Sequence, residues 1–232
     1  MVAPDEPVAA YVLHTRPYRE TSALVDFFTL EHGKVSAVVK GLRRPGSKQR
    51  AVIQPFIPLQ IRWRGRQELK SLISAEAVGH NGILTGNALM CGLYVNELLQ
   101  RLLMPFDGVP RLYVFYQYVI TALVQQNDVE GALRTFERQI LQETGYGLDY
   151  SQLMADQVYR FDLEDWCFRQ VSHLSESERI RYFSGQDLLH IEDDAYEHPS
   201  ARKSAKRLMR LAIDHLTQDK PLQSRSLFQK RS

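Results

Sequence analysis

Cysteine is scarce in this chain of 232 residues, because only Cys91 and Cys167 occur and neither belongs to a CxxC pair. Two thiols cannot form a disulfide framework or a four-thiolate zinc site, so we expect both to be reduced and inert. No run of eighteen apolar residues is present, which argues against a transmembrane helix. The first seven residues carry two acids and no basic residue, so we expect no secretory signal and a cytoplasmic protein.

Motifs of catalysis are also missing. Residues 41–48 have the glycine spacing of a phosphate-binding loop, but they end in Ser47-Lys48, where the motif needs lysine before the hydroxyl residue. His190-Ile191-Glu192 resembles the start of a zinc-deaminase motif, yet no Pro-Cys-x-x-Cys follows. There is no GxSxG and no HExxH. We therefore expect no enzyme, no cofactor and no metal site.

Charge is present in both signs, and it is segregated along the chain. Residues 34–70 hold ten basic residues against Glu68 alone, a net charge of +9. Residues 71–201 hold 8 basic and 19 acidic residues, and residues 202–231 hold nine basic against two acidic, so the net charges are −11 and +7. A concentrated positive field attracts a polyanion even when the total charge, here +2, is near zero. Solvated surface charge is the alternative for any one cluster.

Two regimes of hydrophobic periodicity predict the fold. Residues 8–78 contain five β-branched and aromatic runs, with hairpins expected at His32-Gly33 and around Gly65. Five short strands suit a small closed or partly open barrel. The later pattern is helical over 87–104, 111–124, 129–144 and 201–217, while residues 147–198 are hard to interpret. The predicted fold class is α+β, with a β-barrel domain over residues 1–80 and an all-α domain over residues 81–232.

Binding is the function that this pattern favours. Single-stranded nucleic acid binds surfaces where cations follow the phosphates and flat rings stack on bases. Most aromatic residues of the barrel belong to its core; one of Phe27 and Phe28 points inward, and Trp63 and Tyr18 are the candidates for a ligand contact. The polar loop from Lys40 to Arg50 predicts a solvent-facing arm beside a groove. The barrel residues expected to bind DNA are Arg16, Lys34, Lys40, Arg43, Arg44, Lys48, Arg50, Arg62, Trp63 and Arg64.

Several segments together resemble the bacterial recombination mediator family RecO. The N-terminal ones are Tyr18-Arg-Glu-Thr-Ser22, Phe28-Thr-Leu-Glu-His-Gly-Lys34, Val39-Lys-Gly-Leu-Arg-Arg44, Gln54-Pro-Phe56 and Ser74-Ala-Glu76. The later ones are Leu93-Tyr-Val-Asn-Glu-Leu-Leu99, Phe136-Glu137, Gly145-Tyr-Gly-Leu-Asp149 and Pro221-Leu-Gln-Ser-Arg225, in the order of the family. The resemblance implies an OB-fold barrel followed by a helical domain.

The resemblance also implies a function and partners. The family binds single- and double-stranded DNA, anneals strands coated with single-stranded-DNA-binding protein, and with RecR helps to load RecA. The resemblance therefore also implies a nucleoid-associated location in the cytoplasm and a role in recombination and in the repair of DNA damage. Some members hold zinc through four cysteines after the Gly-Tyr-Gly segment; this chain has Cys167 alone there, so we expect no zinc.

A partner-peptide site is implied on the helix over residues 129–144. The family recognises the acidic, apolar C-terminal tail of the single-strand binder, and Arg134 matches the family's basic contact. An arginine can bind a terminal carboxylate with two hydrogen bonds, and Leu133, Phe136 and Leu141 would form an apolar wall. A solvated arginine near Glu130 and Glu137 is the alternative.

The C-terminal basic helix leaves three alternatives open. Its cations Arg202, Lys206 and Arg210 contact DNA, lie solvated, or neutralise the acidic middle of the chain. The function has alternatives too, because an RNA-binding OB-fold protein would share these charges and a protein-binding adaptor would not need them. Competition between RNA and DNA of one sequence would distinguish an RNA-binding protein from a DNA-binding one. Partner binding that is insensitive to salt would indicate the adaptor.

Overall fold

The computed structural model describes residues 6–79, 82–217 and 221–229 of the chain. The chain divides into two compact units, one made of residues 1–126 and 224–232 and the other of residues 127–223. Among the residues described, none of the helices has the combined length and hydrophobicity that crossing a membrane requires.

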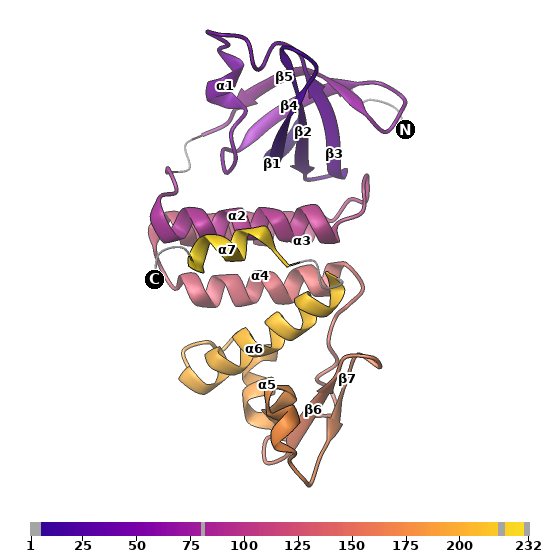
Figure 1. Ribbon diagram of the computed structural model, residues 1–232, viewed down its shortest axis with the longest axis vertical. Coiled ribbons are helices and arrows are strands. Elements are labelled where there is room, and N and C mark those ends of the chain that lie inside the picture. The colour runs from indigo at the N-terminus through magenta and orange to yellow at the C-terminus, as the bar shows by residue number, and fades with distance from the viewer. Residues whose placement is uncertain (1–5, 80–81, 218–220, 230–232) are drawn as a thin grey trace. The chain divides into compact units, whose positions relative to one another are not determined.

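The first unit begins with five strands that close into a barrel in the order β1-β2-β3-β5-β4 (Figure 1). Strands β3 and β5 run parallel and all other neighbours are antiparallel. Val8 of β1 pairs with Ile61 of β4, which completes the ring. The barrel is therefore OB-like. Its elements are β1 (Val8–Tyr18), β2 (Ser22–Thr29), β3 (Gly33–Val39), the short helix α1 (Gln49–Val52), β4 (Leu59–Arg64) and β5 (Lys70–Ala77).

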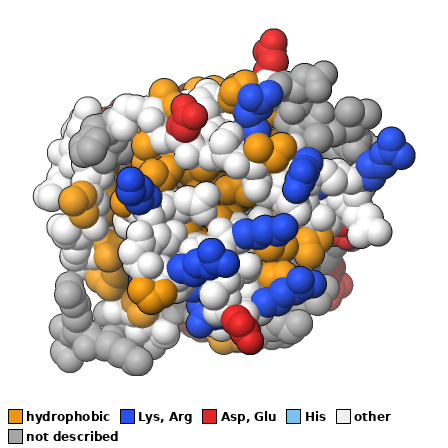
Figure 2. Space-filling model, turned by 90° about the horizontal axis from the view of Figure 1, so that it is seen from above, with side chains coloured by type: hydrophobic (Ala, Val, Ile, Leu, Met, Phe, Trp, Pro, Cys, Tyr) orange, Lys and Arg blue, Asp and Glu red, His pale blue; other side chains and the backbone are white. Residues whose placement is uncertain are grey.

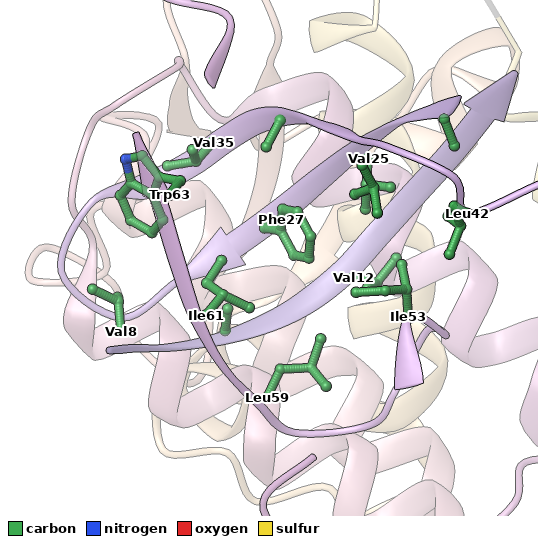
Figure 3. Packing of buried hydrophobic residues seen from close by; sticks show 14 residues of the cluster. Val8, Val12, Val25, Phe27, Val35, Leu42, Ile53, Leu59, Ile61 and Trp63 are labelled. Atoms are coloured by element: carbon green, nitrogen blue, oxygen red, sulfur yellow. The ribbon is translucent and has the colours of Figure 1, made fainter. Parts of the chain in front are cut away.

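Side chains at alternate positions of the strands point inward and fill the barrel interior. Phe27, Ile61 and Trp63 point into the same core, where they meet aliphatic side chains from all sides (Figure 3). Leu59, Ile61 and Trp63 lie two residues apart on β4, so they share its inward face. Phe27 points inward as predicted, and Phe28 faces the outside of the barrel.

The outside of the barrel at Phe28 is covered by protein. The ring of Phe28 lies 5.4 Å from Tyr113 and 5.8 Å from Tyr116, measured between ring centroids, and Phe28 is fully buried. Both tyrosines belong to α3 (Pro110–Gln125), which follows α2 (Gly86–Leu102). Burying Phe28 in this way contributes about 2 kcal/mol by apolar area. Helices α2 and α3 thus form one hydrophobic unit with the barrel.

Gly33 permits the close approach of two turns in this unit. It lies in the left-handed region with φ 59°, as the β2–β3 hairpin requires. A Cβ atom at Gly33 would lie 1.8 Å from the carbonyl oxygen of Asp107, in the connection between α2 and α3. Glycine therefore serves both the hairpin and the packing of the helix connection on it.

The last described segment returns to the first unit. Helix α7 (Gln223–Gln229) places Ser224 against Glu97 of α2. The backbone N–H and the hydroxyl of Ser224 both donate to Oε2 of Glu97, at 2.9 and 2.6 Å. The carboxylate of Glu97 also pairs with Arg101 at 2.8 Å. Residues from both ends of the sequence therefore complete this unit.

The second unit combines helices with a small sheet of order β7-β6-β8. Asp128 caps its first helix, because its side chain accepts from the Gly131 N–H, and Gly145 with φ 84° follows the helix end. Arg138 of this helix binds the carboxylate of Asp194 through two hydrogen bonds. The elements are α4 (Val129–Glu143), β6 (Val158–Asp162), β7 (Cys167–Gln170), the 3₁₀ helix η1 (Glu176–Arg181), β8 (Tyr182–Ser184), α5 (Gly185–Glu192) and α6 (Pro199–Leu216).

The predicted fold class is confirmed, with one addition. The barrel and the four predicted helices are present, and the three-stranded sheet within residues 147–198 is an element that the sequence pattern did not predict. The proposed boundary near residues 80–82 falls partly on residues 80–81, which lie outside the described residues. The division into domains 1–80 and 81–232 stays a prediction.

Candidate nucleic-acid interface

The loop between β3 and α1, together with the first two residues of α1, forms a short cationic arm, which we define as residues 40–50. Its backbone folds as successive tight turns, in which Arg44 N–H donates to Gly41 O at 3.1 Å and Ser47 N–H donates to Arg44 O at 3.2 Å. Turns of this kind satisfy the backbone locally and leave long side chains outside. The exposed cations of the arm are Lys40, Arg43, Arg44, Lys48 and Arg50.

A groove of about 460 Å³ runs beside the arm in the first unit. Arg16 from β1, Arg43 from the arm and Arg50 from α1 lie along it. Its apolar lining includes Leu42 and Ile53. Nη1 of Arg43 also donates to the carbonyl oxygen of Arg19 at 3.2 Å, which fastens the arm to the β1–β2 turn. The fold thus brings three arginines that are distant in sequence to one groove; the other lining residues are Leu13, His14, Thr15, Pro17, Ala23, Pro55 and Leu93.

The cations of the arm are not neutralised by carboxylates. Within residues 6–79, 82–217 and 221–229, ion pairs form at other arginines and lysines, and none forms at Lys40, Arg43, Arg44, Lys48 or Arg50. Lys and Arg side chains gather on the barrel end of the first unit, with few acidic side chains among them (Figure 2). Unpaired cations on one surface are what the binding of a polyanion requires.

Arg16 differs from the arm because it has a carboxylate partner. Its Nη1 lies 3.6 Å from Oδ2 of Asp26, and half of its side chain is exposed. Asp26 is buried and is already bound by Ser36 and, at 2.6 Å, by Nε2 of Gln100. The carboxylate is therefore shared among several donors, and Arg16 keeps an exposed guanidinium at the groove.

Lys34 has a structural contact in the first unit, and its predicted binding of DNA stays a prediction. Its Nζ donates to the carbonyl oxygen of Gln100 near the end of α2, at 2.7 Å. Burial lowers the pKa of Lys34, and the nearby charge of Asp26 opposes that effect only in part. The side chain is directed to the helix that covers the barrel, so it is not part of the arm.

Trp63 is buried inside the barrel. It is 3% exposed, and the ring of His32 lies 5.3 Å from its ring between centroids. Its predicted contact with DNA stays a prediction. Tyr18 is half-buried, and the guanidinium of Arg19 lies 5.2 Å from its ring centroid. Arg62 and Arg64 lie exposed on the outward face of β4 and line neither the groove nor the arm.

The cations of α6 match the charge-neutralising alternative. Nη2 of Arg202 lies 2.9 Å from Oδ1 of Asp128, and Nζ of Lys206 lies 3.4 Å from Oε1 of Glu130. Both carboxylates belong to the acidic middle of the sequence. Each cation thus has a carboxylate partner, and the DNA contact of Arg202 and Lys206 stays a prediction. Arg210 is exposed and lies 3.8 Å from Asp214, so its role stays a prediction.

The residues of the predicted peptide site on α4 are buried. Nη1 of Arg134 lies 2.8 Å from Oε2 of Glu137, and the Arg134 side chain is only 10% exposed. The residues proposed as its apolar wall are part of the core, because Leu133, Phe136 and Leu141 are all buried. Arg134 is therefore not the solvated residue of the alternative interpretation, and its binding of a peptide carboxylate stays a prediction.

Some groove residues were not anticipated from the sequence. Leu42, Ile53 and Leu93 supply apolar surface beneath the arginines. Leu93 belongs to the helical segment 87–104, and only the folded unit brings it to β1. The apolar residues 51–53 beside Arg50 were the one local signal, since they form part of α1 and its end.

Two family models match the chain. The model described as "Recombination protein O N terminal" matches residues 6–80, and "Recombination protein O C terminal" matches residues 84–155. Together they cover more than half of the sequence. The chain belongs to the RecO family. The arm, the groove and the barrel lie within the first of the matched segments, except for Leu93, which lies in the second.

Curated relatives of the family extend over nearly the whole chain. A protein of Pseudoalteromonas atlantica named DNA repair protein RecO is 42% identical over 230 residues, covering 96% of this chain and 94% of the relative. Proteins of the same name from Nitrosococcus oceani and Methylococcus capsulatus are 40% and 38% identical, covering 95% and 96% of this chain and 91% and 93% of those proteins. The similarity to the RecO family therefore includes both units.

Proposed function

We propose that this protein acts in DNA repair and recombination, that it binds DNA along the groove and that it anneals complementary single strands. The observation that carries the proposal is the arm of five exposed cations, which have no carboxylate partner among the residues that the structure describes. The arm lies next to a groove that holds Arg16, Arg43 and Arg50. Membership of the RecO family supports the choice of DNA as the polyanion.

Annealing needs no chemical step on this surface. Two complementary strands repel each other through their phosphates, and a cationic surface that neutralises some of them lowers that repulsion. Base pairing then supplies the free energy, at about 1.4 kcal/mol per stacked base-pair step. An arm on tight turns suits this task because its long side chains follow a phosphate backbone without a fixed register.

The partners implied by the family are part of the proposal. They are the single-strand binder with its acidic tail, RecR, and indirectly RecA, in the cytoplasm near the nucleoid. Binding of the tail at Arg134 would require the Arg134–Glu137 pair to open, at a free-energy cost that the tail carboxylate has to offset. The exposed arm offers an electrostatic contact for an acidic tail without such a cost.

The test is annealing of complementary oligonucleotides coated with the cognate single-strand binder, without ATP. We expect the protein to accelerate annealing and Arg44→Glu to slow it severalfold, because the reversed charge repels phosphates. Arg179→Glu is the matched control, since Arg179 is an exposed arginine on η1 in the other unit. Equal rates for both variants would remove the arm from the mechanism. Preference for RNA over DNA of the same sequence would favour the RNA-binding alternative.

A further inference from the structure

A second cavity of about 400 Å³ lies beside the groove in the first unit. Its lining is mainly apolar and includes Phe56, Ile83, Leu84 and Leu89. Ile83 is 90% exposed and Leu89 37% exposed, so both offer apolar surface to solvent at the cavity. The volume lies within the range of about 300–1,000 Å³ that is typical of small-ligand pockets.

The cavity and the cationic groove are neighbours in the first unit. Pro55 and Leu93 line both of them. A ligand that occupies both therefore meets arginines on one side of these residues and apolar surface on the other. Nucleic acid has this composition in every unit, an anionic phosphate joined through a sugar to a flat base. The polyanion proposed for the groove thus carries a group that suits the cavity.

Phe56 lines the cavity with a ring that is largely buried, because the residue is 7% exposed. Its backbone lies in the left-handed region with φ 69°, which is costly for a residue with a bulky aromatic side chain. Its ring packs on Gly92 of α2, where a Cβ atom would lie 2.9 Å from the ring. The backbone conformation of Phe56 and its packing on Gly92 together fix the ring at the cavity.

Gln54 adds a polar group at the same place. Its Nε2 donates to the carbonyl oxygen of Arg50 at 3.0 Å, which fixes the side chain along α1. Within the described part of the chain its Oε1 accepts no hydrogen bond, and the residue is exposed. An amide oxygen at the rim of an apolar cavity can accept from the amino group of a base. A mainly apolar lining with a few polar groups is typical of a small-ligand pocket.

We propose that the cavity receives an unstacked base of single-stranded DNA while its phosphates lie on Arg16, Arg43 and Arg50. This inference rests on the proposed function, which assigns the DNA phosphates to the groove and leaves the bases without a site. Bases of a duplex are paired and stacked, so only a single strand can fill the cavity. The cavity takes over the ligand contact expected from Trp63, whose ring is buried in the barrel.

The experiment compares an oligonucleotide with an abasic phosphodiester chain of the same length and sugar backbone. We expect the full protein to bind the abasic chain about tenfold more weakly, because one base contact contributes about 1–3 kcal/mol. The difference should persist at high salt, since both chains carry equal charge. Leu89→Gln and Ile83→Gln should weaken binding of the normal oligonucleotide severalfold and leave the abasic chain and the duplex unchanged.

The matched control is Val114→Gln on α3, an exposed aliphatic residue outside both cavities. We expect it to bind every ligand as the unaltered chain does. Equal affinity of the normal and abasic chains would overturn the inference and leave the proposed function standing. An acidic peptide with an apolar end that binds the unaltered chain but not Leu89→Gln, with no base dependence of DNA binding, would overturn it too. Absence of any DNA binding would overturn the proposed function itself.

Discussion

The side-chain amide of Asn96 donates to the backbone carbonyl of Val12 at 3.2 Å, where β1 leaves its regular pairing with β2. It also donates to the carbonyl of Leu13 at 3.2 Å, and its own oxygen accepts from the Tyr116 hydroxyl at 2.8 Å. The register shift between Val12 and His14 turns the second half of β1 toward the groove. One buried amide on α2 therefore secures the bend that presents Arg16.

Replacing Asn96 tests this support. We expect Asn96→Ala to lower the free energy of unfolding by about 2 kcal/mol, because two buried carbonyls and one hydroxyl lose their partner. Urea denaturation measures the change. Asn87→Ala, at an exposed position of the same helix, is the control and should change stability by no more than about 0.5 kcal/mol. A similar loss in both variants would show that helix composition, not the hydrogen bonds, decides the effect.

The salt dependence of DNA binding counts the cations that the arm contributes. We expect the double variant Arg44→Gln, Lys48→Gln to lower the slope of log affinity against log salt by about 1.4 on single-stranded DNA, about 0.7 for each phosphate that is no longer neutralised. Fluorescence anisotropy over a salt titration gives the slope. An unchanged slope with lower affinity would mean that these residues act on the fold of the arm and not on phosphates.

Tryptophan emission tests the placement of Trp63. The chain has two tryptophans, so Trp166→Phe leaves Trp63 as the sole emitter. We expect blue-shifted emission, little quenching by iodide and no change on adding DNA, because the ring is enclosed by the barrel core. Strong quenching by oligonucleotides would restore Trp63 as a stacking residue.

Ion pairing on α6 predicts a small effect on stability and none on DNA. Arg202→Gln removes the contact with Asp128 and alters the hydrogen bond to Tyr196 O, at 2.8 Å, so we expect a loss of about 1 kcal/mol. Thermal unfolding and DNA affinity are measured on the same preparation. A severalfold loss of DNA affinity at unchanged stability would revive the DNA-contacting alternative for this helix.

The lowered pKa of Lys34 makes its contribution to stability depend on pH. Burial is the cause, and it lowers the pKa below the ordinary value of 10.5 that applies in the unfolded chain. Between the two values the unfolded chain holds more protons, so the free energy of unfolding rises with pH in that window. We expect the stability of the unaltered chain relative to Lys34→Met to increase from pH 8 to pH 10. Parallel curves for the two proteins would exclude a lowered pKa.

The barrel could be predicted from the sequence because its signals are local. The glycine at position 33 marks a hairpin, and runs of β-branched residues mark strands on each side of it. The burial of Trp63 was available from the same reasoning, since Leu59, Ile61 and Trp63 occupy alternate positions of one strand. The basic composition around Trp63 favoured an exposed ring, and strand alternation was the stronger constraint.

The groove and the small sheet could not be predicted from the sequence, for a different reason. Arg16 and Arg50 meet at one groove only because β1 bends and α1 folds back beside it, and no local pattern encodes that meeting. Strand β8 has three residues and β7 has four, too few for alternation to be recognised. Arg134 has the composition of a surface residue, and only the fold reveals its buried pairing with Glu137.

The attachment of Ser224 to Glu97 has a consequence for biosynthesis. The ribosome makes the amino-terminal strands first and the seryl residue 127 positions after its glutamate partner. The barrel unit is then completed only after the intervening unit has left the exit tunnel, since domains fold as their residues emerge. A nascent chain stalled before residue 224 would carry the cationic arm on an unfinished support.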